Sequence, residues 1–354
     1  MLGPREEEVL TEVELRWREG SEVGIRVLEV LPNSKVDALA ELTINETKKN
    51  LLIEVKSSGY PYRIREAVMQ LREAQLESPA DFYPVVASSY ISPEGRRLCR
   101  QAGIGYLDAA GNMYINTTGV YIDKETNQKP ESQQARQKKL FTPKATRVYR
   151  ALLEEPQRAW RLAEMADTTD ISIGMVHKVS ERLADAGYAA RGIERRLILI
   201  DPEGLLEAWA DSYRFSEQND VTRLFSTLSS KQGILERISS QVDLRYALTL
   251  FAGADLVAPI TRFNETVLFV DRSDVGKWQQ YLAAERVDSG PNLVLAVPYD
   301  RGVYYRRQKR EGLWVVSNTQ LYLDLFNYTA RGRDQAEHLA RVTGLGEQRR
   351  DIYE

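Results

Sequence analysis

The sequence has very few of the side chains that hold transition metals or form disulfides. Among its 354 residues there is one cysteine, Cys99, and there are two histidines, His177 and His338. A single cysteine excludes an intrachain disulfide and a zinc site built on cysteines, and it fits a protein of the reducing cytoplasm. Two histidines are too few for a histidine-built metal site or a conventional serine–histidine pair. Catalytic chemistry must therefore come mainly from carboxylates, lysine, tyrosine or arginine.

Long apolar segments and a strong charge of one sign are also missing. No apolar run approaches the roughly 18 residues of a membrane span, and the acidic residues 1–8 are unlike a secretory signal. We therefore expect a cytoplasmic protein without a membrane partner. The net charge of −3 excludes a globally basic nucleic-acid binder. Residues 129–200 nevertheless hold 14 Lys and Arg against 9 Asp and Glu, a local charge of +5, which suits phosphate neutralisation; a chance fluctuation is the alternative.

What is present is enough apolar sequence for ordinary cores. Hydrophobic residues make up 43% of the chain, which argues against overall disorder, and the length suggests two or three domains. The pattern divides the chain into an α/β block over residues 1–125, a polar linker over 126–140, a helix-rich segment over 141–212 and a further α/β block over 213–354. The expected fold class is a multidomain α/β protein.

Residues 141–212 predict three helices followed by a β-hairpin. Pro143 suits the first turn of a helix, a second short helix is expected around residues 160–165, and residues 167–170 form a polar turn. The segment "YAARGIERRLILI" then predicts a strand, a basic turn and a second strand.

The third helix has the clearest signals. Ser172 is suited to its N-cap and Gly187 to its C-cap. Val176, Val179 and Leu183 follow one another at helical spacing and form one inward stripe. Polar and basic side chains then lie off the stripe, where they face outward.

The order of helix, helix, helix and hairpin resembles bacterial winged-helix regulators over about 60 residues. The resemblance implies that the N-terminal end of the third helix enters the major groove of duplex DNA and that the hairpin follows the backbone or the minor groove. The residues expected to contact DNA are Ser172, Ile173, His177, Lys178, Arg182, Arg191, Arg195 and Arg196. The alternative is a winged helix used only for protein contacts.

The chemistry-bearing residues lie earlier, in "KVDALAELTINETKKNLLIEVKSSG". Alternation over residues 36–42 places Asp37 on one strand face, a polar turn is expected over 45–50, and Glu54 and Lys56 share one face of the apolar strand that follows. A buried strand does not favour a glutamate and a lysine on the same face without partners. A divalent cation held by Asp37 and Glu54 would supply one, and Lys56 would orient or deprotonate an attacking water.

This order of Asp, 16 residues and Glu-Val-Lys resembles the PD-(D/E)XK, or restriction-endonuclease-like, superfamily. The resemblance implies that Asp37 and Glu54 bind Mg²⁺ and that Lys56 is catalytic. The alternatives are a plain half-exposed strand pair and a nuclease-like fold in which Glu54 and Lys56 form only an ion pair.

The neighbouring helices agree with that resemblance in part. Gln70 stands where some relatives carry a glutamine, whereas RecB-like members have a tyrosine four residues later and Ala74 occupies that place here. Glu8 or Glu12 of the first helix would be a further ligand.

The last block predicts a helix over residues 243–257, strands over 265–270 and 292–297 with a helix between them, and a helix over about 319–326. This order of helices and strands resembles that of nucleotidyltransferases. It lacks a Gly-Ser followed by paired Asp-x-Asp metal ligands, so transferase catalysis is not expected here.

The stretches "YALTLFAGADLVAP" and "QLYLDLFNYTARGRDQAEHL", together with the helix–hairpin segment, resemble AbiEi-type antitoxins of type IV toxin–antitoxin systems over roughly residues 20–345. The resemblance implies a transcriptional regulator whose partners are duplex DNA, a nucleotidyltransferase toxin and a second copy of the chain. Common members carry the winged helix at the N-terminus, whereas here it is central.

Two further hypotheses are kept beside that of a transcriptional regulator. One is a Mg²⁺-dependent DNA endonuclease targeted by the winged helix, and the other is an interaction protein that sequesters a toxin.

Overall fold

The computed structural model describes most of the chain, namely residues 2–18, 23–31, 34, 36–44, 47–59, 61–77, 82–126, 140–228, 230–241 and 243–346. The chain divides into two compact units: unit 1 is Met1–Arg136 with Asp185–Gly187, and unit 2 is Gln137–Ala184 with Tyr188–Glu354. Each contains helices and a large mixed sheet, so the expected mixed α/β fold class is confirmed. The division falls in the expected linker, of which residues 127–139 lie outside the described part. The boundary expected at 212/213 lies inside unit 2 and stays a prediction.

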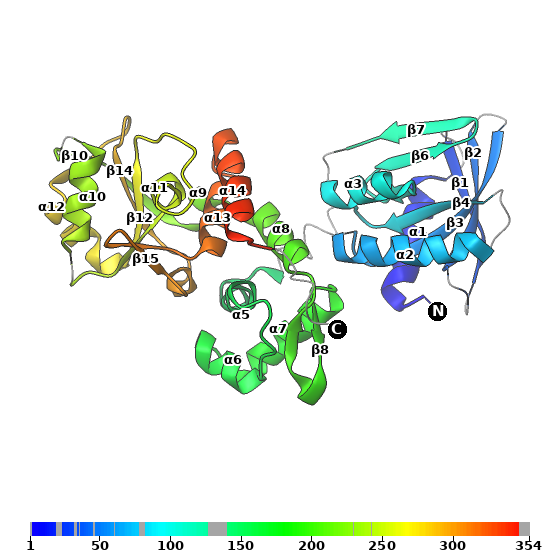
Figure 1. Cartoon of the computed structure of the whole chain (residues 1–354), viewed down its shortest axis with the longest axis horizontal. Coiled ribbons are helices and arrows are strands. Elements are labelled where there is room, and N and C mark those ends of the chain that lie inside the picture. The colour runs from blue at the N-terminus through cyan, green and yellow to red at the C-terminus, as the bar shows by residue number, and fades with distance from the viewer. Residues whose placement is uncertain are drawn as a thin grey trace. The chain divides into compact units, whose positions relative to one another are not determined.

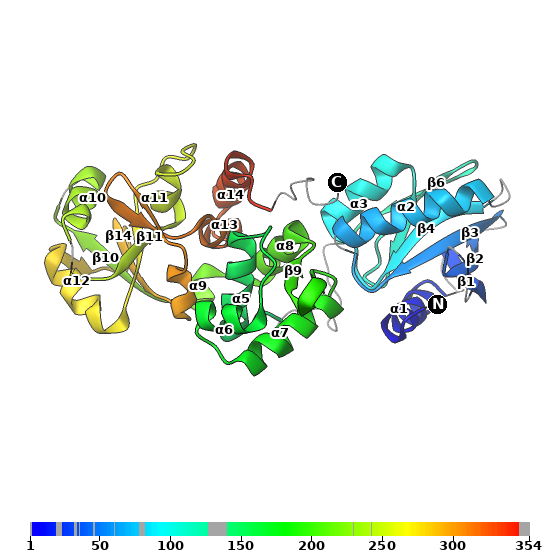
Figure 2. The ribbon, with the colours of Figure 1, turned by 60° about the horizontal axis from the view of Figure 1, so that its bottom comes forward.

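Unit 1 is a seven-stranded mixed sheet with helices on both faces (Figures 1 and 2). Its elements are α1 (Pro4–Arg16), β1 (Val23–Val30), β2 (Ala38–Ile44), β3 (Thr47–Lys56), α2 (Pro61–Glu77), β4 (Phe82–Ser88), α3 (Pro93–Ala102), β5 (Gly105–Asp108), β6 (Met113–Thr117) and β7 (Val120–Lys124). The strands follow sequence order; β3, β4 and β5 are parallel, and the other neighbours are antiparallel. The connecting helices α2 and α3 cover one face and α1 covers the other.

Side chains of β3 point alternately to the two faces of the sheet and so contribute to both hydrophobic cores of unit 1. Leu51 and Ile53 are buried in the core that includes α1, while Leu52 is buried in the core that includes α2 and α3. Because successive side chains of a strand point to opposite faces, Glu54 and Lys56 lie on the α2 face with Leu52. The central strand therefore delivers two charged side chains into an otherwise apolar layer.

Strand β3 begins earlier than the sequence indicates. The polar turn expected over residues 45–50 is wrong from Thr47 onward, because Thr47 already pairs with β2; the first two residues of that stretch lie outside the described part. Glu41 on β2 meets Lys48 on β3, with 3.0 Å between Oε1 and Nζ. Cross-strand pairs of opposite charge stabilise a sheet, so a polar stretch continues the strand.

The first part of unit 2 contains three helices and a hairpin, followed by a fourth helix. Its elements are α5 (Pro143–Glu154), α6 (Leu162–Thr169), α7 (Ile173–Asp185), β8 (Ala189–Arg191), the turn η1 (Ile193–Arg195), β9 (Leu197–Leu199) and α8 (Pro202–Ser212). Val176, Val179 and Leu183 on α7 are fully buried, which confirms the inward stripe. The N-cap is confirmed as well, since Ser172 Oγ accepts a hydrogen bond from Met175 N at 3.3 Å.

Helix α6 is longer than the sequence indicates. The polar turn expected over residues 167–170 is wrong for most of that stretch, because α6 continues to Thr169. The Thr169 hydroxyl is turned inward and donates to Met165 O at 2.6 Å. A threonine that satisfies its hydroxyl on the preceding turn can remain helical.

The second part of unit 2 is a seven-stranded mixed sheet in the order β13-β10-β14-β12-β11-β16-β15 (Figure 1). Its elements are α9 (Phe215–Gln218), β10 (Asp220–Ser226), α10 (Lys231–Ser239), β11 (Tyr246–Thr249), α11 (Leu250–Asp255), β12 (Thr266–Val270), η2 (Arg272–Asp274), α12 (Val275–Tyr281), β13 (Ala284–Arg286), β14 (Leu293–Val297), η3 (Arg301–Tyr304), β15 (Gln308–Arg310), β16 (Leu313–Val315), α13 (Asn318–Phe326) and α14 (Ala330–Thr343). The expected strand–helix–strand unit is present, with β12 and β14 parallel and α12 between them.

One helix prediction in this sheet is wrong in its first half. Residues 243–257 have the composition of a helix, but Tyr246–Thr249 form strand β11, and α11 begins only at Leu250. All four residues of β11 are buried, and the strand pairs with β12 and β16. Pairing and burial here outweigh the local helix preference.

A buried polar network joins the two parts of unit 2. Arg150 on α5 is fully buried, and its Nε donates to Gln320 Oε1 on α13 at 3.0 Å. Its Nη2 donates to the Tyr299 hydroxyl at 2.9 Å. Gln320 Nε2 in turn donates to Asp324 Oδ1 at 2.7 Å, which also accepts from the Tyr213 hydroxyl at 2.8 Å. Since removing one partner leaves another polar group unpaired in the core, the network favours a single arrangement of these elements.

The network predicts a pH dependence of stability. Burial raises the pKa of Asp324 to about 7, and hydrogen bonds from Thr249, Tyr213 and Gln320 oppose the rise. Because the pKa is higher in the folded than in the unfolded chain, the stabilisation is complete below about pH 4 and is lost as the pH rises through the folded value. From about pH 5 to about pH 8, this group should lower the free energy of unfolding by roughly 2–3 kcal/mol. Urea unfolding followed by tryptophan fluorescence measures it.

The variant Asp324→Asn should lose that pH dependence, because its amide keeps the same shape without a titrating group. The matched control is Asp220→Asn, which changes an exposed carboxylate of the same unit and should keep the wild-type pH profile. An Asp324→Asn profile identical to that of the wild type would contradict the assignment.

Candidate active site and nucleic-acid interface

The end of β3 and the facing helix α2 bring four polar side chains together, one of which is Glu66, whose Oε2 lies 4.0 Å from Lys56 Nζ. Lys56 Nζ donates to Glu54 Oε1 at 2.8 Å and to Gln70 Oε1 at 2.6 Å. Glu54 is 3% exposed and Lys56 is 7% exposed. The structure thus places Glu54 and Lys56 on one strand face and adds Gln70, the glutamine singled out in the sequence.

Asp37 directly precedes β2 and lies against the end of β3. Its Oδ2 accepts a hydrogen bond from Val55 N at 2.9 Å, and its backbone N donates to Ile53 O at 3.1 Å. These bonds hold the Asp37 carboxyl group beside the backbone of Val55, the residue between Glu54 and Lys56. Four of the residues singled out around this motif therefore belong to one cluster, which we call the carboxylate–lysine cluster: Asp37, Glu54, Lys56 and Gln70.

Electrostatics in the carboxylate–lysine cluster disfavour a second negative charge. Burial raises the pKa of Glu54 to about 7; Lys56 opposes the rise, whereas Asp37 and Glu6 add to it. A bound cation would relieve this cost by favouring the ionised form. Glu6 was not singled out in the sequence, where Glu8 and Glu12 were named as further ligands of the first helix.

Ser88 is a member of the site that the sequence does not reveal. It ends β4 and pairs in register with Lys56 on the parallel neighbour β3. Its hydroxyl is fully buried and has no hydrogen-bond partner within the described residues. A serine after an apolar strand carries no spacing signal, so only the strand pairing brings it to the cluster.

The donor set fits a hard divalent cation. Asp37 and Glu54 supply carboxylate oxygens, which Mg²⁺ prefers, and Mg²⁺ usually keeps several waters and needs only one or two carboxylates. The unpartnered Ser88 hydroxyl is suited to bind a water or substrate oxygen nearby. No group of three or more His, Cys, Asp or Glu suited to a metal occurs in the part of the chain that the structure describes, so any such ion would rest on two carboxylates.

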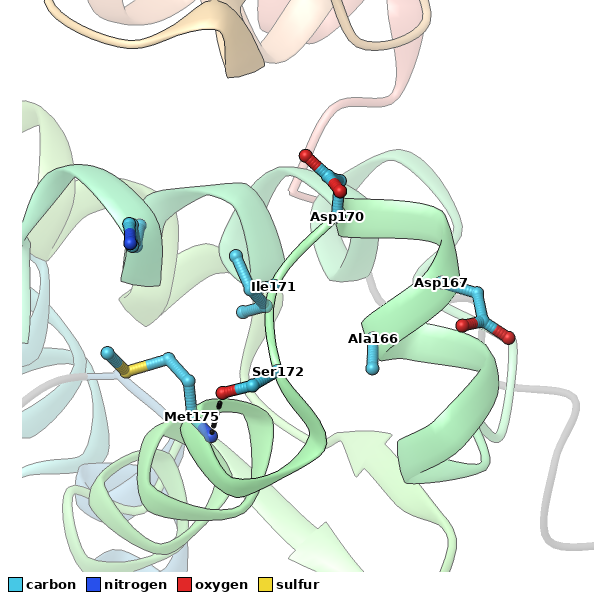
Figure 3. A pocket seen from close by; sticks show the side chains of 7 residues that line it. Ala166, Asp167, Asp170, Ile171, Ser172 and Met175 are labelled. Atoms are coloured by element: carbon cyan, nitrogen blue, oxygen red, sulfur yellow. Dashed lines mark hydrogen bonds between the residues drawn. The ribbon is translucent and has the colours of Figure 1, made fainter.

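The predicted nucleic-acid interface lies on the outside of unit 2. Ile173 is 55% exposed at the first position of α7, and Figure 3 shows the Ser172 hydroxyl turned back toward Met175. Seven of the eight residues expected to contact DNA are exposed, and Arg196 is half-buried. The helix face and the hairpin together present Ser172, Ile173, His177, Lys178, Arg182, Arg191, Arg195 and Arg196.

Several of these cations already have partners. Arg196 Nη2 lies 2.9 Å from Glu194 Oε2 in the hairpin, and Arg191 Nη2 donates to Ser180 Oγ at 3.3 Å. His177 Nδ1 lies 3.4 Å from Glu181 Oε2. Lys178 and Arg195 are different, since neither forms an ion pair with a described residue.

Acidic groups surround the start of α7. Asp167 and Asp170 help to line a hollow there, together with Lys144 (Figure 3). The negative charge of Asp170 is compensated by two arginines: Arg147 Nη1 lies 3.7 Å from Asp170 Oδ2, and the Arg301 guanidinium also contacts this carboxylate. Residues 140–200 hold 10 Lys and Arg against 8 Asp and Glu, a charge of +2, so three of the five charges counted over 129–200 lie in 129–139.

Comparisons of the chain with known protein families, with curated proteins and with solved structures find no match. Among the described helices, none has both the length and the apolar character of a membrane span. The geometry of the carboxylate–lysine cluster and of the exposed α7 face therefore carries the functional argument.

Proposed function

We propose that this protein binds duplex DNA through a winged helix-turn-helix formed by α5, α6, α7 and the β8–β9 hairpin. The observation that carries the proposal is the exposure of the α7 face over a fully buried Val176, Val179 and Leu183 stripe. The stripe holds the helix to the body of unit 2, so the opposite face is presented outward on a rigid support.

The tip of α7 has the side chains that groove recognition needs. The major groove admits a helix, and apolar side chains there contact the methyl group of thymine. Ile173 is suited to such a contact because its large apolar side chain is left exposed. Lys178 on the helix and Arg195 on the hairpin would bind phosphates, which position a protein on the duplex. The AbiEi resemblance suggests a transcriptional regulator as the context for this binding.

A second function, Mg²⁺-dependent cleavage of DNA, is favoured by the carboxylate–lysine cluster. In a PD-(D/E)XK site the residues that hold the ion would be Asp37 and Glu54. A bound Mg²⁺ would stabilise the charge that develops on the reacting phosphate. The chain's own contribution is to hold the Lys56 ammonium between Glu54 and Gln70, from where it can orient a water and hold its proton.

The DNA-binding proposal predicts the effect of removing Lys178 and Arg195, which form no ion pair with a described residue. We expect Lys178→Ala and Arg195→Ala each to weaken duplex binding for all sequences and to lower the slope of log affinity against log salt by about 1, because each loses one phosphate contact. Fluorescence anisotropy at several salt concentrations measures both quantities.

The matched control is Arg286→Ala, which removes an exposed arginine from β13 and should leave the salt slope unchanged. A second comparison is Ile173→Ala, which should reduce discrimination between sequences while the salt slope stays the same. An unchanged salt slope in both Lys178→Ala and Arg195→Ala would reject the docking of α7 and the hairpin.

The cleavage proposal predicts that the full chain cuts DNA with Mg²⁺ or Mn²⁺. Glu54→Gln and Lys56→Ala should each lower the cleavage rate by about a hundredfold or more, since each removes an interaction with the reacting groups. Gel assays with supercoiled, linear and single-stranded DNA measure the rate.

Glu41→Gln is the control for the Glu54→Gln and Lys56→Ala variants. Glu41 lies on the neighbouring strand β2 and binds Lys48 and Arg26, so its loss should leave cleavage intact. If the folded wild-type chain cleaves none of the three DNA forms, the enzymatic proposal is rejected and the DNA-binding proposal is unaffected.

The raised pKa of Glu54 predicts how metal binding depends on pH. A metal ligand must be deprotonated, and the pKa of this carboxyl is about 7. We expect Mn²⁺ affinity to rise about tenfold per pH unit below that value and to level off above it. Isothermal titration calorimetry at several pH values, with Glu54→Gln as the variant that loses the dependence, checks the prediction; a flat profile in the wild type would contradict it.

A further inference from the structure

A hollow beside β15 and β16 in unit 2 gathers positive charge. It has a volume of about 310 Å³, and its lining includes Arg245, Arg307, Lys309, Trp314 and Asp243. We call it the β15–β16 hollow. It lies in the second sheet of unit 2 and does not include any residue of α7 or of the β8–β9 hairpin.

Arg307 is the central cation of the β15–β16 hollow. Its Nη1 donates to Tyr246 O at 2.9 Å, and its guanidinium lies 4.3 Å from the centre of the Trp314 ring. Burial and the like charge of Arg245 lower its pKa. Neither Arg307 nor Lys309 forms an ion pair with any residue that the structure describes, so the cations stand together without full compensation.

Tyr304 packs against Arg245 behind the hollow and does not line it. Its hydroxyl is buried and has no hydrogen-bond partner among the described residues, and the side chain is 8% exposed. The Arg245 guanidinium lies 4.9 Å from the centre of its ring. Arg245 is itself held by Asp271, with 3.1 Å between Nε and Oδ2.

We propose that the β15–β16 hollow binds a phosphate group. Guanidinium groups match phosphate oxygens in a planar, two-bond geometry, and the lysine adds a compact charge. Because Asp271 already pairs with Arg245, Arg307 and Lys309 are the two lining cations that have no ion pair with a described residue. A phosphate dianion can contact both with a charge on each side, whereas a single carboxylate carries one charge; Asp243 on the rim lowers the net charge of the hollow by one. The hollow has the size of the smaller ligand pockets in proteins, so the phosphate can belong to a free mononucleotide or to the 5′ end of a nucleic-acid strand.

Calorimetric titration of the full chain tests this site with three probes: inorganic phosphate, AMP and a 5′-phosphorylated dinucleotide. The dinucleotide is too short to occupy a helix and a hairpin together, which keeps the test independent of duplex binding. We expect Arg307→Gln to weaken binding about tenfold, and Lys309→Gln to weaken it about threefold, because each removes one charge-assisted contact. Asp243→Asn should tighten binding, an effect that loss of structure would not give.

Arg310→Gln is the matched control. Arg310 neighbours Lys309 on β15 but does not line the hollow, and its Nε donates to Gln308 Oε1 at 2.9 Å. Tighter binding of AMP than of the dinucleotide identifies a free nucleotide as the source of the phosphate, and the reverse identifies a strand end. No saturable binding of any probe at concentrations up to about 10 mM, or equal weakening by Arg310→Gln, would overturn the proposal.

Discussion

Each of the two units contains a carboxyl group that is buried away from water and that its neighbours must stabilise. Glu54 is 3% exposed and Asp324 is 1% exposed, and an ionised carboxylate in such a place is stable only when donors or cations surround it. The two units meet this requirement differently. The side-chain donor to Glu54 is the ammonium of Lys56, at the end of a flexible stem, whereas Asp324 is held by the neutral groups of Thr249, Tyr213 and Gln320.

This difference separates the cluster for which we propose metal binding from a structural one. A lysine can be redirected when a cation or a water arrives, so the charge balance around Glu54 responds to what binds. The donors around Asp324 come from β11, from the residue that follows α8 and from α13 itself. They are fully or almost fully buried. Moving one of them would leave its partners unsatisfied. The same reasoning explains why buried Arg150 joins α5 to α13 and does not serve as a nucleic-acid contact.

The sequence was sufficient where the signal is local and failed where pairing between distant segments decides. Alternation along β3 predicts that Glu54 and Lys56 share a face, and helical spacing predicts the stripe of α7. Strand β11 was expected as helix because its burial between β12 and β16 is invisible in its own composition. Ser88 was missed for the same reason, since only its register opposite Lys56 brings it to the cluster. The β15–β16 hollow depends on the approach of Arg245 to Arg307, which are far apart in sequence.

The α7 surface carries less charge than its segment of sequence suggests. Arg147 and Arg150 are turned inward onto Asp300 and Gln320, and Arg196 is paired with Glu194. Electrostatic attraction from this face is therefore modest, and in the proposed complex long-range steering of DNA would depend on few cations. When phosphate contacts are few, discrimination must come from the base-contacting end of the helix. In the proposed complex Ile173 suits that role, because its large apolar side chain is 55% exposed, whereas the Ser172 hydroxyl caps the helix.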